Sequence, residues 1–121
     1  MQATSTHPFV RALSEWTPYE QDEPPGASFH FLLKTNEVPG LTIGHVDLTG
    51  PIQKTAATHT DWEQVYLVLE GKGRVHLCGV MHAVKAGSVV SIPKNTWHWV
   101  EVAAGEKLKY VYVNQHRCDR R

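Results

Sequence analysis

Histidines and tyrosines are the side chains of this sequence that are best suited to chemistry, and two stretches bring them together. The first, residues 50–71, contains His59 and Tyr66, and the second, residues 87–98, ends on His98. An imidazole nitrogen is a good ligand for zinc, iron, nickel or copper. A tyrosine hydroxyl can transfer a proton or orient a substrate oxygen by hydrogen bonds. These residues predict a site for a small molecule.

Alternation along predicted strands adds further candidates. Tyr110 and Tyr112 share one face of a β-like run near the end of the chain. His30, His45 and His76 lie on other runs of the same kind. A lone histidine on a strand is more often a structural residue than a ligand, so the last three are the weaker candidates.

The elements that must position these residues are short strands. From residue 29 onward the chain alternates between runs rich in β-branched and aromatic residues and turns rich in glycine and proline, one of them at Gly71-Lys72-Gly73. No segment of this part shows a sustained helical period. Many short strands at even spacing predict an all-β sandwich, jelly roll or closed barrel. The expected strands are 29–35, 41–48, 64–69, 73–78, 81–84, 88–92, 97–102 and 108–113.

The beginning of the chain has a different character. Four prolines fall within residues 1–27, which predicts an extended arm with at most one short helical turn. Trp16 and Tyr19 are expected to pin this arm onto the surface of the domain. The predicted organisation is therefore an arm, a single β domain over residues 28–116, and a tail over residues 117–121.

Composition limits the partners. Twelve basic and twelve acidic residues give a formal net charge of zero, whereas a nucleic-acid-binding protein normally has a basic excess. The two cysteines are far apart, which argues against a disulfide scaffold and fits a reducing compartment. The first residues do not resemble a signal peptide, and no apolar run could span a bilayer. We expect a cytoplasmic protein whose partners are a small molecule and a second copy of the chain, with no membrane and no nucleic acid.

The two stretches, taken in order, resemble the two sequence motifs of the cupin superfamily. The first family motif has a His-x-His pair, then an acidic residue, then six residues and a glycine. The second has a glycine, then five residues, a proline, a spaced glycine and a histidine. The resemblance covers roughly residues 40–115. It implies a cupin-type jelly-roll β-barrel, a double-stranded β-helix, carrying the extended N-terminal arm.

The resemblance also implies a metal site, with three departures from the family pattern. His59 and His98 match two of the ligand histidines, and Gln64 matches the position of the acidic ligand. Ala57 stands where the first histidine of the pair would be, and Asn95 stands at the spaced glycine. An amide oxygen is a weaker and neutral ligand. The implied cofactor is a divalent transition metal (Zn, Fe, Ni or Mn) that is weakly bound or absent.

Strand parity leaves one ambiguity beside this site. Glu63 shares a face with Val65, Leu67 and Leu69, and that aliphatic face would ordinarily be the core. The family register instead points Gln64 into the site. The two interpretations agree if the aliphatic face contacts a second subunit, because many cupin sheets pack in this way. We prefer this register, which predicts a homodimer.

Three functions remain open. The first is a metal-dependent lyase, isomerase or cyclase acting on a carbonyl or sugar-acid-like molecule, with Tyr66, Tyr110 or Tyr112 transferring protons. The second is a degenerate, metal-poor cupin that binds a small ligand as a sensor or accessory protein, which Ala57 favours. The third is a metal-dependent dioxygenase.

Overall fold

The computed structural model describes residues 8–20, 25–54 and 56–116, and these residues form an all-β domain. A single 3-10 turn, η1, precedes the strands. The elements in chain order are η1 (Leu13–Glu15), β1 (Thr17–Tyr19), β2 (Ala27–Val38), β3 (Leu41–Thr49), β4 (Ile52–Gln53), β5 (Glu63–Leu77), β6 (Val80–Lys85), β7 (Val89–Ile92), β8 (His98–Val102) and β9 (Lys107–Gln115). The predicted all-β class is confirmed.

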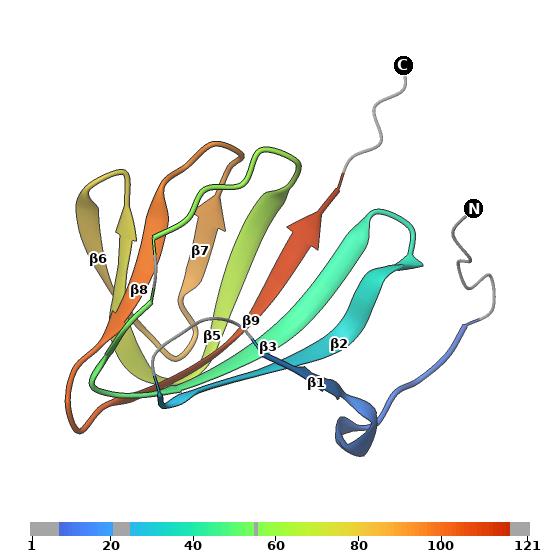
Figure 1. Cartoon of the computed structure of the whole chain (residues 1–121), viewed down its shortest axis with the longest axis horizontal. Helices are drawn as coiled ribbons and strands as arrows, with labels where there is room; N and C mark the ends of the chain where they lie inside the picture. The colour runs from blue at the N-terminus through green and yellow to red at the C-terminus, as the bar shows by residue number, and fades with distance from the viewer. Residues whose placement is uncertain (1–7, 21–24, 55, 117–121) are drawn as a thin grey trace.

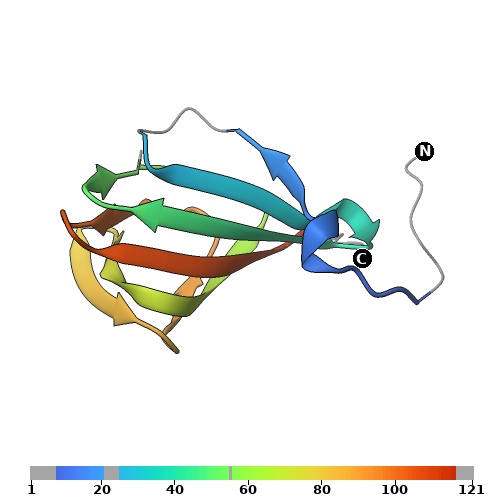
Figure 2. The same ribbon diagram turned by 90° about the horizontal axis from the view of Figure 1, so that it is seen from below.

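The strands form two sheets that curl around a common interior (Figure 1). Sheet A has the order β1-β2-β3-β9-β5-β7, and sheet B contains β4, β8, β5 and β6. All the pairs are antiparallel. Seen from below, β2, β3 and β9 lie side by side along sheet A (Figure 2).

Strand β5 belongs to both sheets, which corrects the expected turn at Gly71-Lys72-Gly73. Its first part pairs with β7 and β9, and its second part pairs with β6 and β8. A register shift between Val68 and Glu70 bends the strand, as β-bulges do. Gly71 adopts a φ of +84°, and a Cβ there would lie 1.9 Å from the carbonyl oxygen of Lys107. The glycine therefore marks a bend within one strand rather than a turn between two.

The interior between the sheets is apolar at its closed end. Side chains from both sheets meet there, and the most deeply buried are Leu48, Val75, Ile92, Val102 and Leu108. Val46, Val100 and Tyr110 are equally buried and lie where the core meets the cavity described below. Strand β9 connects the two halves of sheet A because it pairs with β3 on one side and β5 on the other. Polar residues gather at the open end of the interior.

The described part of the arm lies against β2 and β3. Strand β1 pairs with β2, and the Trp16 ring packs 5.2 Å from the ring of His45. The guanidinium of Arg11 donates two hydrogen bonds to the carboxylate of Glu37 and one to the carbonyl of Leu32. These contacts agree with the expectation that Trp16 pins the arm. The rest of the predicted arm and the tail, residues 117–121, lie outside the described residues.

Among the described residues, no helix has the length and apolar character needed to cross a bilayer.

Candidate functional site

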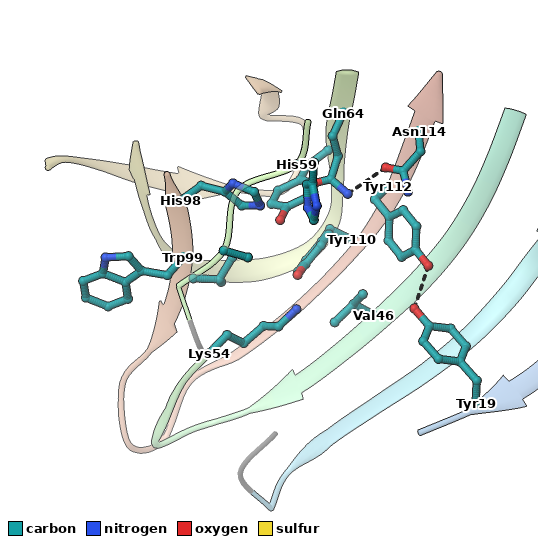
Figure 3. A pocket seen from close by; sticks show the side chains of 13 residues that line it. Tyr19, Val46, Lys54, His59, Gln64, His98, Trp99, Tyr110, Tyr112 and Asn114 are labelled. Carbon is teal, nitrogen blue, oxygen red and sulfur yellow. Dashed lines mark hydrogen bonds between the residues drawn. The ribbon is translucent and has the colours of Figure 1, made fainter. Parts of the chain in front are cut away.

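A cavity of about 150 Å³ opens between the two sheets at the polar end of the barrel (Figure 3). It collects residues from β3, β5, β8 and β9, from the segment before β5, and from β1 of the arm. Among the described residues it is lined by Tyr19, Val46, Lys54, Ala57, His59, Gln64, Tyr66, His98, Trp99, Val100, Tyr110, Tyr112 and Asn114. All six residues expected from the sequence to carry the site therefore meet in one place.

Strand β5 points Gln64 into the cavity and Glu63 away from it. The strand alternates between exposed and buried positions from its first residue, and Gln64 is 7% exposed whereas Glu63 is exposed. Val65 and Leu67 lie on the same outer face as Glu63. The register that places Gln64 inside is therefore the one that the fold adopts.

His98 begins β8 with its ring fixed in one tautomer. Its Nδ1 lies 2.8 Å from the carbonyl oxygen of Thr96. A carbonyl only accepts, so Nδ1 must carry the proton, and Nε2 keeps its lone pair for the cavity. A backbone bond of this kind is the usual way in which a ligand imidazole is oriented.

His59 lies beside His98, with 5.0 Å between the ring centroids. It comes from the segment before β5, where its ring stacks on Trp62 at 4.6 Å. The backbone N–H of Asn95 donates to the carbonyl of His59 at 2.7 Å. Asn95 has a φ of +65°, a conformation that asparagine tolerates better than most residues. It can therefore replace the family's glycine without loss of the loop that holds His59.

The electrostatics of the cavity favour neutral imidazoles. Burial lowers the pKa of His59, and the neighbouring His98 and the charge of Lys54 lower it further. Burial also lowers the pKa of His98; its bond to Thr96 opposes this shift and Lys54 adds to it. None of the described residues that line the cavity is an aspartate or glutamate. At neutral pH the two imidazoles therefore present lone pairs rather than charges.

Gln64 presents an acceptor that lacks a partner. Its Nε2 donates to Oδ1 of Asn114 at 2.7 Å across the β5–β9 pair, which fixes the orientation of the amide. Its Oε1 is buried and has no hydrogen-bond partner. A buried acceptor without a partner costs about 1–3 kcal/mol, so this oxygen is available to accept a hydrogen bond from a molecule in the cavity.

The three tyrosines form the floor and one wall of the cavity. The rings of Tyr66 and Tyr110 lie 4.4 Å apart, and Tyr66 meets His98 edge to face at 6.5 Å. The ring of Tyr112 lies over Gly44, where a Cβ would be 2.1 Å from its Cζ. Only glycine leaves room for this ring. Gly44 is thus a positioning residue that the sequence did not reveal.

The arm contributes Tyr19 to the same wall. Its hydroxyl lies 2.6 Å from the hydroxyl of Tyr112, and its ring stacks on Phe31 at 4.1 Å. Burial is the main cause that raises the pKa of both Tyr19 and Tyr112. Both hydroxyls therefore stay protonated at neutral pH and act as hydrogen-bond donors.

Three histidines considered as weaker candidates lie away from the cavity. His30 and His45 pair with each other across β2 and β3 and face outward beside Trp16, because alternation gives the cavity face to Val46. His76 stacks on Trp99 and bonds the carboxylate of Glu101.

Three polar or charged residues of the cavity were missed by sequence reasoning, namely Tyr19, Lys54 and Asn114. Asn114 had a usable signal, because it continues the alternation of Tyr110 and Tyr112. Lys54 and Tyr19 lie outside the long strands, where no periodicity indicates a face.

The donor set differs from that of a conventional metal centre. Within the described part of the chain, no group of three or more histidine, cysteine, aspartate or glutamate side chains is placed to hold a metal ion. The cavity offers two imidazoles and, as a third donor, the amide oxygen of Gln64. Ala57 pairs with His98 through two backbone hydrogen bonds of 2.9 Å, so the position of the missing histidine is directly beside the site.

Comparison with known sequences gives one clear match. The profile of the Cupin domain family matches residues 49–114, which include both histidines, Gln64 and the three tyrosines. No curated protein sequence is similar enough to count as a match.

Solved structures share the fold. KdgF from Halomonas superposes with a TM-score of 0.74 and 23% identity over 94% of this chain and 97% of its own. A predicted oxalate decarboxylase from Thermotoga maritima gives a TM-score of 0.79 and 21% identity over 90% and 100%. The iron(II) form of HppE gives 0.76 and 16% over 93% of this chain and 62% of its own. At these identities the likeness concerns the fold alone.

Proposed function

Because the chain belongs to the cupin family, we propose that it binds a divalent transition metal weakly at His59, Gln64 and His98 and uses it on a small molecule. The observation that carries this proposal is the buried Oε1 of Gln64, which has no partner and shares the cavity with two imidazoles. Imidazole nitrogen and amide oxygen are both donor types that such metals accept. Structural neighbours with this fold include a metal-containing protein.

The residues present fit a weak site rather than a strong one. All three donors are neutral, and Ala57 supplies none, so we expect the affinity to fall by orders of magnitude below that of a complete ligand set. When bound, such an ion would supply Lewis acidity toward a carbonyl oxygen. We propose Zn, Fe, Ni or Mn as the metal.

The tyrosines are proposed to act on the substrate. The side chains of Tyr66, Tyr110 and Tyr112 line the cavity, and their hydroxyls can hydrogen-bond a substrate oxygen. The raised pKa of Tyr112 makes it a donor that orients a carbonyl rather than a base. This chemistry suits a lyase, isomerase or cyclase acting on a carbonyl or sugar-acid-like molecule. A dioxygenase remains an alternative on the same residues.

A second candidate function is supported by the charge of the cavity. Lys54 brings a positive charge, and none of the described lining residues is a carboxylate. A cavity of this kind can hold a small anion by hydrogen bonds without any metal. The chain would then be a metal-poor cupin that binds or senses a small ligand.

Metal binding by the purified chain separates the two candidates. We expect calorimetric titration with Co²⁺ to give one weak site per chain, lost in His98→Ala and in Gln64→Leu. His82→Ala is the matched control, because His82 is exposed on β6. Ala57→His should tighten Co²⁺ binding, since it adds an imidazole beside His98. Titrations that show no Co²⁺ binding by either the parent chain or Ala57→His would rule out the metal site in favour of the second candidate.

The expected partners and location are proposals as well. We propose a homodimer formed through the outer face of sheet A, where Val65, Leu67 and Leu69 are exposed. We also propose a cytoplasmic location, and no nucleic-acid or membrane partner.

A further inference from the structure

A second hollow, of about 480 Å³, opens on sheet B and shares no lining residue with the cavity. It lies beside the pair formed by β5 and β6, at one end of the molecule (Figure 1). Its described lining residues are Lys72, Gly73, Arg74, Ala83, Val84, Lys85, Ser88 and Glu106. Three of these carry a positive charge and one carries a negative charge. The hollow is therefore basic, although the chain as a whole has no net charge.

Two lysines face each other across this strand pair. Lys72 of β5 is directly opposite Lys85 of β6 in the antiparallel register, and Arg74 lies two residues further along β5 on the same face. Side chains directly opposite in such a pair have Cβ atoms about 4.5–5.5 Å apart, and like charges placed there are destabilising. The fold thus gathers positive charges at a point where an anion would stabilise them.

The chain neutralises only part of this charge. The carboxylate of Glu106 lies 3.7 Å from Nζ of Lys72 and 3.8 Å from the guanidinium of Arg74. A second carboxylate, that of Glu101, lies 3.3 Å from Nε of Arg74. Among the described residues, no carboxylate lies within ion-pair distance of Lys85. The lysine side of the hollow therefore keeps a positive charge that the described chain does not match.

The hollow also has a hydroxyl. Oγ of Ser88 accepts a hydrogen bond from the backbone N–H of Lys85 at 3.0 Å, so its proton can be donated to a ligand. Lysine ammonium groups bind phosphate as point charges, and an arginine guanidinium binds it through parallel N–H bonds. Two ammonium groups, a guanidinium and a hydroxyl together form a suitable donor set for phosphate oxygens.

We propose that this hollow binds the phosphate group of a small phosphomonoester. Such a group carries a charge of about −1.5 to −2 at neutral pH, so it can match both lysines at once. A carboxylate or a phosphodiester carries a single negative charge and matches them less well. The proposal does not depend on the function proposed for the cavity, because the two sites have no residue in common. It gives the domain a second ligand site, outside the barrel interior.

The test is a titration of the isotope-labelled full chain with methyl phosphate, followed by NMR. Dimethyl phosphate at equal ionic strength is the control, because it keeps the tetrahedral group but has one negative charge. We expect methyl phosphate to cause saturable shifts of the backbone amides of Gly73, Arg74 and Ser88, and dimethyl phosphate to bind at least about fivefold more weakly. Equal binding of the two would overturn the assignment to a phosphomonoester.

The position of the shifts separates this site from the cavity. Shifts confined to residues such as His59 and His98 would overturn the proposal and would support an anion in the cavity instead. Titrations without any saturable shift would also overturn it, and they would leave the metal site in the cavity unaffected.

Lysine substitutions test the charge directly. Lys72→Met and Lys85→Met should each weaken the binding of methyl phosphate by about fivefold or more, since each removes one charge from beside the anion. Lys34→Met is the matched control, because Lys34 is exposed on β2 and does not line the hollow. Equal affinities of Lys85→Met and Lys34→Met for methyl phosphate would contradict the proposal.

A substitution of Glu106 should have the opposite effect. Its Oε1 accepts a hydrogen bond from the backbone N–H of Ala103 at 3.2 Å, and Glu106→Gln keeps an oxygen that can make this bond. Removal of the negative charge frees the neighbouring cations, so methyl phosphate should bind about two- to fivefold more tightly. A folded Glu106→Gln chain that binds methyl phosphate no more tightly than the parent would show that the anion does not lie in this hollow.

Discussion

Both faces of sheet A carry apolar side chains, but the two faces differ. The inner face packs the core through residues such as Leu48 and Ile92 and also buries polar residues beside the cavity, whereas the outer face leaves its aliphatic side chains exposed. On the face toward the interior, Gln64, Asn114 and Thr42 are buried polar residues, and Gln64 bonds Asn114. On the outer face, aliphatic side chains are exposed, with Leu67 at 44% and Val89 at 67%. A sheet normally buries its apolar face. The difference teaches that the inner face serves a cavity and that the outer face is suited to a protein contact.

Replacing a leucine by alanine on each face should give the largest difference in the free energy of unfolding. Leu48 on β3 is 0% exposed, and Leu69 on the outer face is 48% exposed. Leu48→Ala should lower the free energy of unfolding by about 2–5 kcal/mol, because it leaves a cavity in the core. Leu69→Ala should cost about 1 kcal/mol or less, since half of its surface is already in water. Urea denaturation of both variants measures the contrast, and equal losses would break the comparison.

Crowding on the inner face should give the next largest effect. Gly44→Ala places a methyl group against the ring of Tyr112. We expect a loss of about 1–3 kcal/mol in the free energy of unfolding, the usual cost of overpacking. A shifted Tyr112 ring should also separate its hydroxyl from Tyr19, which ring NMR signals would detect. A Gly44→Ala chain as stable as the parent would show that the wall around Tyr112 is not tightly packed.

Breaking the hydrogen bond between the arm and the inner face, which joins Tyr19 and Tyr112, should have a smaller effect on stability. Tyr19→Phe removes one hydroxyl from the pair with Tyr112 and keeps the ring on Phe31. We expect a loss of about 0.5–1.5 kcal/mol in the free energy of unfolding. Tyr19→Phe should leave the near-UV circular dichroism largely unchanged, in contrast to Tyr19→Ala, which removes the ring. If Tyr19→Phe and Tyr19→Ala had the same near-UV circular dichroism and the same stability, the arm would not rest on the cavity wall.

The ion pair between Arg11 of the arm and Glu37 of β2 should make the stability of the protein depend on pH. Hydrogen bonding by Arg11 is the main cause that lowers the pKa of Glu37. A lowered carboxyl pKa stabilises the fold above the unfolded value of about 4.5. This contribution is lost as the pH falls through the lowered pKa of the folded state. Both groups are partly exposed, so the effect is at most about 1 kcal/mol.

Urea midpoints measured from pH 3 to pH 7 test this dependence. Arg11→Met should flatten the part of the profile that is due to Glu37. A profile of Arg11→Met that parallels the parent's throughout would show that the ion pair does not hold the arm.

Substitutions on the outer face should change the stability of a single chain least, but they should change whether two chains form a dimer. Val65, Leu67, Leu69 and Val89 form an exposed aliphatic surface, and an identical surface on a second copy could cover it. We expect a dimer in sedimentation velocity at micromolar concentration. Leu67→Lys should convert it to a monomer that unfolds at nearly the same temperature. A parent chain that sediments as a monomer would remove this assignment.

The sequence predicts the architecture well where strands are long and alternate. Seven of the strands coincide with expected runs because glycine and proline mark their ends. Strands β1 and β4 have only three and two residues, and β1 contains Pro18, so neither carries a periodic signal. The continuity of β5 was missed because a glycine such as Gly71 usually predicts a turn. Here the glycine instead lets the strand pass close to the backbone carbonyl of Lys107.

The site is less predictable than the fold. His59, Gln64 and His98 meet because the spacing of the two motifs fixes their places in the barrel. Lys54 lies in an irregular segment and Tyr19 in a three-residue strand, and only the folded chain brings them to the cavity. Whether the three motif residues bind a metal depends on charge and coordination, which spacing does not determine.

Strand β9 has a consequence for how the protein forms. It is the latest in the chain of the described strands, yet it lies between β3 and β5 in sheet A, pairing Leu41 with Gln115. Contacts between residues so distant in sequence slow folding, because a long loop must close before they form. During synthesis, β3 and β5 must wait with unpaired edges until β9 leaves the ribosome. We therefore expect the cavity, which has walls from β3, β5 and β9, to be completed only in the last step of folding.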